Sequence, residues 1–538
     1  TLFPYTTLFR SAMRLKEEVV VQANIRMGGW VAGVRLISHA EATADSSSSS
    51  RVLFRYFSPV HERLSADTQR LLIAGALLPW MPSNLLSTLT GVAGAASHLD
   101  VLCAQNLFIE RVADATTTYR LHALFREFLL HLGQRTLTDA TRADLQRRAA
   151  QAFEAEGDVD TAVDLYLDAG SFDLATHALV DMFEAKLALG QFDRWLARVA
   201  RVPVPTLVVQ PALLYGLARV AFLREDSIAP DHYRRAAEAF LAAGDRRGAM
   251  LCAAGALEWS YNTDSFIDHQ YWVRLLRHPV VAETDDLSVQ HRLRLLNGRL
   301  LAAFYSGDFE PEAPTFVEQV LFVLRSGGGE NDSLSAGITL LGCLERHKRW
   351  DQATIVASHM EAMLISPRLG PRIKILVRQQ IASDVYRQCG NYAGARELAL
   401  QALSEARAQD FRVLEYEAVV VVLFAALYMD DAAEAQLMIE QLGRLSDGAN
   451  VYHLRMGHQM RAWHLLQTDR PAAAVENGQA LRTAIMSSGM PAGFRATWLL
   501  FAIYVRYANG DADGACKELE DVACAAEGGS RATLLINA

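Results

Sequence analysis

The 538-residue chain is poor in lysine and in cysteine. None of its lysines follows a glycine; they occur only at positions 16, 186, 348, 374 and 517. A phosphate-binding P-loop needs a Gly-x-x-x-x-Gly-Lys-Ser/Thr run, so ATP binding by that route is excluded within this chain. The six cysteines stand singly, without a CxxC pair. That spacing favours reduced cytosolic core thiols over a disulfide framework.

Motifs of several enzyme classes are also missing. The chain has no His-Glu-x-x-His run and no Gly-x-Ser-x-Gly run, so zinc-protease and α/β-hydrolase activities have no support. Cys343 and His347 are four residues apart, and His453, His458 and His464 recur at near-helical spacing, but spacing alone does not assemble a metal site. We therefore expect buried cysteine and surface histidine, no metal and no enzyme activity.

Long hydrophobic runs and clustered positive charge are absent as well. The longest apolar run, Ala418–Met429, is shorter than the roughly 20 residues that span a bilayer, so no membrane anchor is expected. The net charge of −9 argues against nucleic-acid binding over the whole surface, because phosphate binding requires clustered positive charge. Any DNA contact would be local or would lie outside this chain.

The patterns that are present are mostly helical. The composition is 51% hydrophobic but only 9% aromatic, with 15 prolines, which favours stacked helices over a sheet protein. From Thr141, which forms a capping-box pattern with Asp144, helix-turn-helix phrases recur. Each phrase has small and aromatic residues on its packing faces and a turn between two helices; the turns are expected near Gly157, Gly244, Gly307, His347, Gly390, Asp430, Asp469 and Gly510.

From Gly307 onward these turns recur at a spacing of roughly 40 residues, which is typical of tetratricopeptide-like repeats with longer helices. We therefore predict an α-solenoid over residues 141–538, in which stacked helix pairs bury a continuous core and present a concave groove. The proline-rich segment Arg201–Pro211 and the glycine run Gly327–Gly329 are the expected breaks or loops.

A different pattern occupies Asn106–Leu132. Two short apolar strands, Leu107–Val112 and Tyr119–Leu121, flank a polar Asp-Ala-Thr-Thr-Thr turn, and a helix follows at once. This order predicts a β-hairpin that leads into a helix. Apolar residues recur along that helix at i, i+3, i+4, i+7, i+8 and i+11, which predicts one continuous apolar stripe at positions 121, 124, 125, 128, 129 and 132.

Helices are also expected before the hairpin. Ser65 is the expected N-cap of the first of them, which Pro79 and Pro82 stop, and two more lie near Ser83–Leu89 and Ala95–Gln105. Together with the hairpin and its helix, they give residues 54–140 the size of a winged-helix domain.

A winged helix can bind DNA through the helix before its hairpin. In this chain that helix, Ala95–Gln105, has no lysine or arginine and carries Asp100, which is the wrong charge for the major groove. We therefore expect a structural or regulatory domain.

The run Asn-Leu-Phe-Ile at 106–109, with Tyr-Arg-Leu-His-Ala-Leu-Phe-Arg-Glu-Phe-Leu at 119–129, resembles a known family. It is similar to the small winged-helix domain that follows the nucleotide-binding domain in MalT-like, LuxR-type ATP-dependent transcriptional regulators. These are signal-transduction ATPases with a helical-repeat sensor. The resemblance covers nearly the whole chain, and it implies a winged-helix domain followed by a tetratricopeptide-like sensor.

The N-terminal segments have their own interpretations. Residues 1–11, TLFPYTTLFRS, match the translation of a common sequencing-adapter oligonucleotide and are interpreted as an assembly artefact. By the resemblance, the Gly-Trp-Val-Ala-Gly-Val run within 12–45 is the C-terminal remnant of a nucleotide-binding domain. The serine run Ser46–Ser50 has low complexity, so 46–53 is predicted to be a linker. We expect a chain truncated at both ends, without the ATPase and the LuxR-type DNA-binding domain.

Two residues of the winged-helix domain are candidates for a nucleotide-sensing site. His122 precedes the helix Ala123–Leu132 and resembles the histidine that helps to hold bound ADP in related signal-transduction ATPases. A helix N-terminus with an imidazole and Arg126 nearby favours an anionic phosphate. The alternative is a hydrogen-bonded histidine at a hairpin-helix junction. The chain alone implies no cofactor; ATP or ADP is implied only for the full-length protein.

In the helical array, the aromatic residues Trp259, Tyr261, Tyr271 and Trp272 are the notable cluster for a ligand in the groove. Aromatic residues in such repeats also pack between helices, and that alternative stays open.

The functional hypothesis is the sensor and coupling portion of a cytoplasmic MalT-like regulator. The resemblance implies that an inducer or a regulatory protein binds the solenoid and ends an ADP-held state. It also implies ATP-driven self-association and DNA binding through the missing domain. The other hypothesis is a stand-alone repeat scaffold that binds a protein or peptide.

Overall fold

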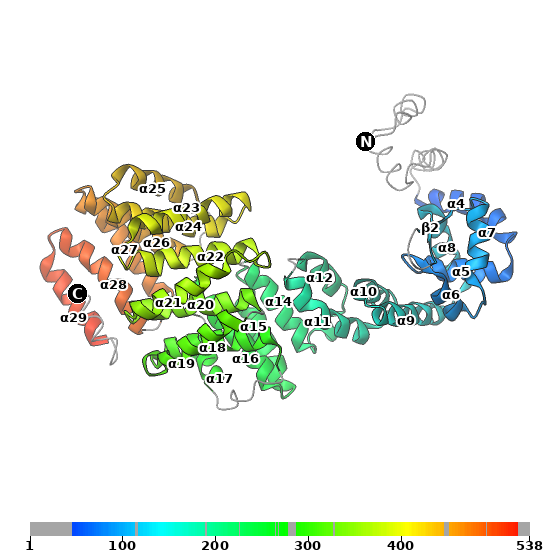
Figure 1. Cartoon of the computed structure of the whole chain (residues 1–538), viewed down its shortest axis with the longest axis horizontal. Helices are drawn as coiled ribbons and strands as arrows, with labels where there is room; N and C mark the ends of the chain where they lie inside the picture. The colour runs from blue at the N-terminus through cyan, green and yellow to red at the C-terminus, as the bar shows by residue number, and fades with distance from the viewer. Residues whose placement is uncertain are drawn as a thin grey trace, which may run out of the picture. The chain divides into compact units, whose positions relative to one another are not determined.

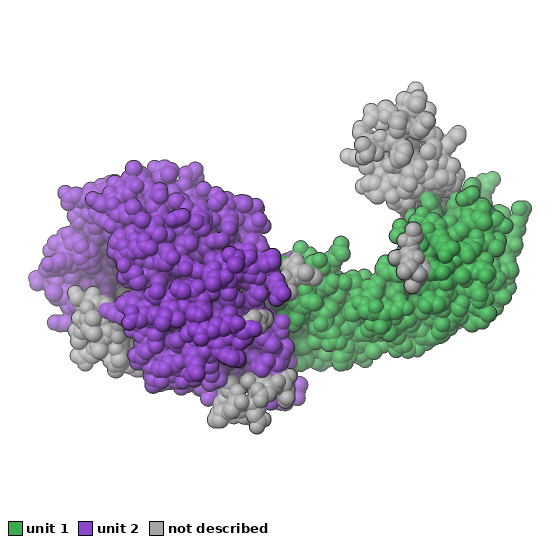
Figure 2. Space-filling view, viewed as in Figure 1, with its two compact units in different colours: residues 1–213 green, residues 214–538 purple. Residues whose placement is uncertain are grey.

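The structure is a computed structural model, and it describes residues 46–112, 117–188, 191–224, 226–263, 265–266, 268–277, 287–326, 329–445, 451–490 and 492–525. The predictions for residues 1–11 and 12–45 lie outside this set. The chain forms two compact units, Thr1–Leu213 and Leu214–Ala538 (Figure 2). Figure 1 gives the helix and strand labels used below.

Within the described residues of unit 1, the first elements form a small domain of helices and three short strands. Its elements are α4 (Ser46–Glu62), α5 (Ala66–Ala76), β1 (Met81–Pro82), α6 (Ser83–Thr90), α7 (Ala95–Ala104), β2 (Ile109–Val112), β3 (Thr118–Leu121) and α8 (Ala123–Thr136). The predicted N-cap is confirmed, because the Ser65 side chain accepts a hydrogen bond from the backbone N–H of Thr68. The predicted hairpin and the helix after it are confirmed as β2, β3 and α8.

The sheet has one strand more than the sequence predicted. Antiparallel pairing sets Ile109 opposite Leu121 and Val112 opposite Thr118 in the hairpin. On its other edge β3 pairs with β1, so the strand order is β1-β3-β2. A two-residue strand that contains a proline is too short to show alternation, which is why the pattern missed it.

The serine run is not the predicted linker. Residues Ser46–Ser50 form the first turns of α4, which continues to Glu62. The helix contributes Phe57, which is 1% exposed, to an aromatic core. The Phe57 ring lies 5.3 Å from Phe125 and 5.6 Å from Phe128 of α8. The burial of Phe57 stabilises the part of α4 that carries it, and the serine run extends the same helix toward its N-terminus.

Unit 1 continues into helices that the sequence assigned to the solenoid. These are α9 (Asp139–Ala155), α10 (Val159–Asp168), α11 (Phe172–Ala188), α12 (Phe192–Val199) and α13 (Val204–Leu207). The cap of α9 is Thr138, whose side chain accepts from the Thr141 N–H, so the capping pattern read at Thr141 is three residues late. The division between the compact units falls at Leu213/Leu214, after the predicted break 201–211, and not at residue 141.

Unit 2 consists of helices over its described residues. They are α14 (Pro211–Leu223, which begins at the end of unit 1), α15 (Ala229–Ala242), α16 (Arg246–Thr263), α17 (His269–Leu276), α18 (Val289–Ser306), α19 (Phe309–Ser326), α20 (Glu330–Arg346), α21 (Trp350–Met363), α22 (Pro371–Ile381), the π-helical turn η2 (Ala382–Tyr386), α23 (Tyr392–Ala408), α24 (Arg412–Tyr428), α25 (Ala432–Leu445), α26 (Val451–Gln467), α27 (Pro471–Ser487), α28 (Ala492–Ala508) and α29 (Ala512–Ala525).

The turns between paired helices follow one pattern in both units. A residue in the left-handed conformation ends the first helix, as at Gly390, where φ is +77°. The next residue, Asn391, donates its N–H to the carbonyl of Tyr386, and its side chain accepts from Gly394 N–H to cap the second helix. The predicted turns are confirmed, and the left-handed residue is Gly157, Gly244, Gly307, Lys348, Gly390, Asp430, Asp469 or Gly510. Glycine and aspartate recur because this conformation disfavours most side chains.

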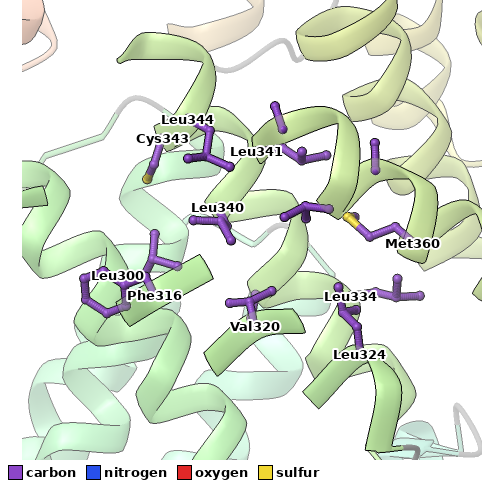
Figure 3. Packing of buried hydrophobic residues seen from close by; sticks show 14 of the residues in the cluster. Leu300, Phe316, Val320, Leu324, Leu334, Leu340, Leu341, Cys343, Leu344 and Met360 are labelled. Atoms are coloured by element: carbon purple, nitrogen blue, oxygen red, sulfur yellow. The ribbon is translucent and has the colours of Figure 1, made fainter. Parts of the chain in front are cut away.

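A row of helices runs through the array, in which α16, α18, α20, α22, α24, α26 and α28 each contact the next; we call it the inner row. The apolar core lies between the inner row and the helices that alternate with it along the chain, such as α19 and α21. Figure 3 shows the part around α18 to α21, where Leu300, Phe316, Leu340 and Met360 pack together and are each at most 2% exposed. The mostly α fold with a helical solenoid is confirmed.

The array also makes a contact that simple stacking does not provide. Helix α16 contacts α26, far along the chain. Nearby, the N–H of Phe266 donates to the carbonyl of Ser488 at 3.4 Å, and Phe266 is 6% exposed. We call these contacts the seam. Because of the seam, the described part of unit 2 is not an open row whose repeats touch only their neighbours.

Candidate functional site

His122 lies at the junction predicted from the sequence, as the N-cap residue of α8. The hairpin fixes its backbone, because its N–H donates to the carbonyl of Phe108 at 2.8 Å. Its own carbonyl accepts the first helical bond, from the N–H of Arg126. The His122 side chain does not cap the helix, so the first backbone N–H groups of α8 point toward this junction without a side-chain acceptor from the N-cap.

Arg126 has a different task. Its Nε donates to the carbonyl of Ala76, at the end of α5, at 2.9 Å. Burial lowers the pKa of Arg126, although Asp168 acts in the opposite direction. A cation at the C-terminal end of a helix is favourable, so this bond joins α8 to α5. The two predicted residues therefore have different environments. His122 lies at a helix N-terminus, whereas Arg126 uses its Nε for a hydrogen bond that joins two helices.

The acidic residue of the helix before the hairpin is used inside the domain. Asp100 of α7 accepts a hydrogen bond from the Tyr119 hydroxyl at 2.8 Å and lies 3.8 Å from Arg111 of β2. Burial and the bond to Asp100 raise the pKa of Tyr119 to about 12. These contacts attach α7 to the sheet, which fits a structural role.

Two of the four aromatic candidates in the array are core residues. Trp259 is 6% exposed and its ring lies 6.2 Å from that of Phe222, and Trp272 is 2% exposed. Tyr271 is half-buried against Trp272, with ring centroids 4.7 Å apart. Such buried indoles pack helices together, which favours the packing alternative for Trp259 and Trp272.

Tyr261 is the candidate that reaches polar groups. It extends from α16 toward α20, where a Cβ at Gly342 would collide with its hydroxyl, and that same Cβ would lie 3.6 Å from Gln380 Nε2 of α22. Burial raises the pKa of Tyr261 well above its usual value, and the charge of Asp384 raises it further. The glycine at 342 thus allows a hydroxyl and an amide to converge beside the inner row.

The sequence reading missed Asp384, which lies in the middle of this region. The residue is 8% exposed, in η2, and Gln380 Nε2 donates to its Oδ2. Burial, together with the charge of Glu345 on α20, raises the pKa of Asp384 to about 7. A signal existed: Ile373, Val377 and Ile381 set an apolar stripe, and Asp384 continues it at i+11. A carboxylate on a buried stripe is costly unless it has partners.

Buried ionic pairs link other helices of unit 2. Arg219 of α14 lies 3.2 Å from Glu258 of α16, and their side chains are 8% and 17% exposed. Arg294 of α18 lies 3.1 Å from Asp332 of α20, with 7% and 17% exposed. Such pairs join successive helices of the array at fixed positions. Neither pair was predicted, because single charged residues in a helical sequence read as solvent-facing.

Within the described residues no group of three histidine, cysteine or carboxylate side chains could hold a metal ion. His453, a member of the predicted histidine set, is buried beside Tyr416, with ring centroids 4.6 Å apart. The sequence analysis predicted a surface histidine here, and for His453 that prediction is wrong. Among the same residues, no helix is long and apolar enough to cross a membrane.

Comparison with known proteins bears on the small domain of unit 1. A family model described as the MalT winged helix domain matches residues 58–141. This segment is a MalT-type winged-helix domain. Its matched bounds are close to the predicted 54–140, and α5 to α8 with the three strands account for nearly all of it. The resemblance to MalT-like regulators is thereby confirmed.

Curated relatives agree with this assignment. The HTH-type transcriptional regulator MalT of Vibrio cholerae is 35% identical over 94 residues, which are 18% of this chain and 10% of that protein. MalT of Klebsiella pneumoniae subsp. pneumoniae is 23% identical over 201 residues, 35% of this chain and 22% of that protein. The chain spans less than a quarter of the length of these relatives.

Two further matches differ in kind. The serine/threonine-protein kinase PknK of Mycobacterium tuberculosis is 26% identical over 216 residues, 38% of this chain and 19% of that protein. A solved structure, described as a signal transduction ATPase with numerous domains with a tetratricopeptide repeat sensor from Pyrococcus horikoshii, covers 96% of this chain and 70% of its own, with 13% identity and a TM-score of 0.39. The fold of the array follows from its own helices and turns.

Proposed function

We propose that this chain is the sensor and coupling portion of a bacterial MalT-like, LuxR-type transcriptional regulator that acts in the cytoplasm. The helical array binds a small-molecule inducer or a regulatory protein. The MalT-type winged-helix domain couples that binding to the nucleotide-binding domain and the DNA-binding domain of the full-length protein. ATP-driven self-association of the full-length protein would follow.

The observation that carries the proposal is the joining of a MalT-type winged-helix domain to a long helical array in one chain. A domain whose candidate DNA-reading helix holds Asp100 against Tyr119 is unsuited to binding a major groove. A stacked helical array offers a large recognition surface. Sensing and coupling are therefore the tasks that suit these two parts.

The residues at the start of α8 bear on the nucleotide. An ADP or ATP phosphate fits the helix N-terminus at His122, because backbone N–H groups and an imidazole both favour an anion. Arg126 fits less well, since its Nε already donates to the carbonyl of Ala76. When bound, the nucleotide would supply negative charge at this junction; His122 would hold it, and Arg126 would keep α8 in place.

The first test uses the complete gene. A P-loop motif upstream and a helix-turn-helix downstream are expected. Natural stop codons at both ends, without either motif, would overturn the proposal in favour of a repeat scaffold that binds a protein or peptide.

The second test uses the full-length protein and His122→Ala. We expect weaker ADP binding, measured by calorimetry, and a higher basal activity on a reporter promoter. His131→Ala, on the same helix, is the matched control and should leave both unchanged. Unchanged ADP affinity in His122→Ala would discard the role of that residue.

The third test concerns the sensor. Sugars, peptides and candidate regulatory proteins are titrated into the purified chain, and thermal stability and calorimetric heat are recorded. A true inducer should bind the chain and also change promoter occupancy of the full-length protein. A molecule that binds without that change would contradict the coupling.

A further inference from the structure

Two acidic residues lie on contacting elements at the inner row. Asp384 lies in η2, and Glu345 lies one residue before the end of α20. Helix α20 contacts both α22 and η2, and the charge of Glu345 acts directly on Asp384. Two carboxylates on contacting elements that interact with each other disfavour simultaneous ionisation.

The backbone around Asp384 is unusual. In η2 the N–H of Arg387 donates to the carbonyl of Ala382, five residues earlier, at 3.1 Å. Single π-helical turns inside α-helices occur often at functional sites. Within this turn Asp384 is 8% exposed.

The hydrogen bonds of the pair do not cancel its charge. Gln380 Nε2 donates to Asp384, and Gln388 Nε2 donates to Glu345 Oε1 at 2.6 Å. Amides stabilise a carboxylate without neutralising it. Among the ion pairs of the described residues, Arg387 lies 3.7 Å from Glu345, whereas Asp384 has no basic partner within 4.0 Å.

Other titratable and charged groups face the pair from each packed element. Arg346 and Cys343 come from α20, Lys348 from the turn after α20, Arg387 from the end of η2, and Tyr261 from α16. On the α21 side, the Tyr386 hydroxyl donates to Glu361, with Glu397 of α23 nearby. Arg387 also lies over the Phe424 ring of α24, at 5.0 Å. The two arginines act mainly on Glu345, which leaves Asp384 as the group that holds the proton.

We propose that Asp384 and Glu345 form a proton-responsive switch in the inner row, in which one bound proton keeps η2 packed against α20 and its loss loosens that contact. This inference stands independently of the proposed sensor function, because it concerns the packing of unit 2 alone. No ligand is required for the transition.

The sign follows from the raised pKa of Asp384. An unfolded chain has an ordinary aspartate, which ionises near about pH 4, whereas folded Asp384 holds its proton to about 7. The proton therefore contributes stability that is fully present below about pH 4 and is lost as pH rises toward 7. Above that value Asp384 is charged in both states, and the loss stops. Burial also raises the pKa of Glu345, which acts in the same direction.

Hydrogen exchange read by mass spectrometry tests the switch in the intact chain. After correction for the intrinsic exchange rate, opening of the peptides that cover η2 and α20 should increase by about tenfold between pH 6 and pH 8, because one proton links the equilibrium over part of that range. Peptides of α28 should not show the step. No pH step in the η2 and α20 peptides would overturn the proposal.

Substitutions assign the step to the pair. Asp384→Asn, which is neutral at both pH values, should abolish it, and Glu345→Gln should shift it to lower pH. Asp351→Asn, an exposed carboxylate on α21, is the matched control and should keep it. A step that persists in Asp384→Asn contradicts the proposal.

A second measurement covers the case in which a variant does not fold. The protonated carboxyl of Asp384 can be followed in the wild-type chain by difference infrared spectroscopy with labelled aspartate. A carboxyl titration with a midpoint near 7 supports the switch. If every aspartate ionises below about pH 5, as ordinary carboxyls do, the switch is excluded.

Discussion

The MalT-type winged-helix domain and the helical array use the same ionic contact in opposite environments. In the winged-helix domain Arg120 lies 3.5 Å from Glu110, and their side chains are 59% and 66% exposed. In the array Arg294 lies 3.1 Å from Asp332, with 7% and 17% exposed. An exposed pair is screened by water and contributes little, whereas two charges inside the array depend on each other.

This difference teaches what holds each part together. The winged-helix domain has an aromatic core, and ion pairs such as Arg120–Glu110 lie on its surface. The array has an apolar core too, but buried charges connect its successive helices. Such pairs need not add net stability; their geometry favours one alignment of neighbouring helices over others. Removal of a single charge should therefore lower the free energy of unfolding more in the array than in the winged-helix domain.

Arg294→Ala should give the largest effect. It leaves the largely buried carboxylate of Asp332 without its partner, which costs about 3 to 5 kcal/mol in the free energy of unfolding. Urea unfolding followed by circular dichroism measures it. The double substitution Arg294→Met with Asp332→Leu should recover most of the loss. If the double variant is as unstable as the single one, packing and not charge explains the effect.

Phe128→Ala should be comparably costly in the winged-helix domain. The ring is fully buried and stacks on Phe125, with centroids 6.0 Å apart. Removal of a buried phenyl ring leaves a cavity and costs about 3 to 5 kcal/mol. Exchange protection of the α8 amides should fall, while protection in α18 to α21 should not. An equal loss in both regions would show that the two parts unfold together.

Gly390→Ala should have an intermediate effect, because a side chain in the left-handed conformation costs about 1 to 2 kcal/mol. Gly443→Ala is the matched control: Gly443 lies in α25, and a Cβ there meets nothing within 4 Å. That control should gain about 0.5 to 1 kcal/mol from helix propensity. Chemical denaturation reports both values, and a destabilised Gly443→Ala would contradict this account of the turns.

Arg120→Ala should have the smallest effect, below about 1 kcal/mol, because its partner Glu110 stays hydrated. Thermal unfolding at low and at high salt checks this expectation. A loss as large as that of Arg294→Ala would remove the contrast between the two regions.

Local patterns predicted most of this fold. The spacing of Leu124, Phe125 and Phe128 predicted α8, and the glycine and aspartate turns predicted the helix pairs. His122 was proposed from the family resemblance, and its predicted place at the junction of the hairpin and α8 is confirmed. The missed features depend on distant parts of the chain: β1 needs β3 as a partner, and α4 needs the phenylalanines of α8.

Asp384 was missed for a different reason. It continues the apolar stripe of Ile373 and Val377, but a single carboxylate in a helical sequence is expected to face solvent. The aromatic candidates show the opposite error, in which residues of a suitable type are not placed to bind a ligand. Trp259 and Trp272 looked like ligand residues by type, but burial assigns them to packing, and only Tyr261 reaches the polar groups of α20 and α22.

The seam between α16 and α26 has a kinetic consequence. Contacts between neighbouring repeats are local in sequence and form quickly, but the bond from Phe266 to Ser488 joins positions that lie far apart along the chain. High contact order slows folding, since a long loop must close before the contact stabilises anything. In unit 2 the contacts between neighbouring helices should therefore form first and rapidly. The contact between the two distant segments should form last and slowly.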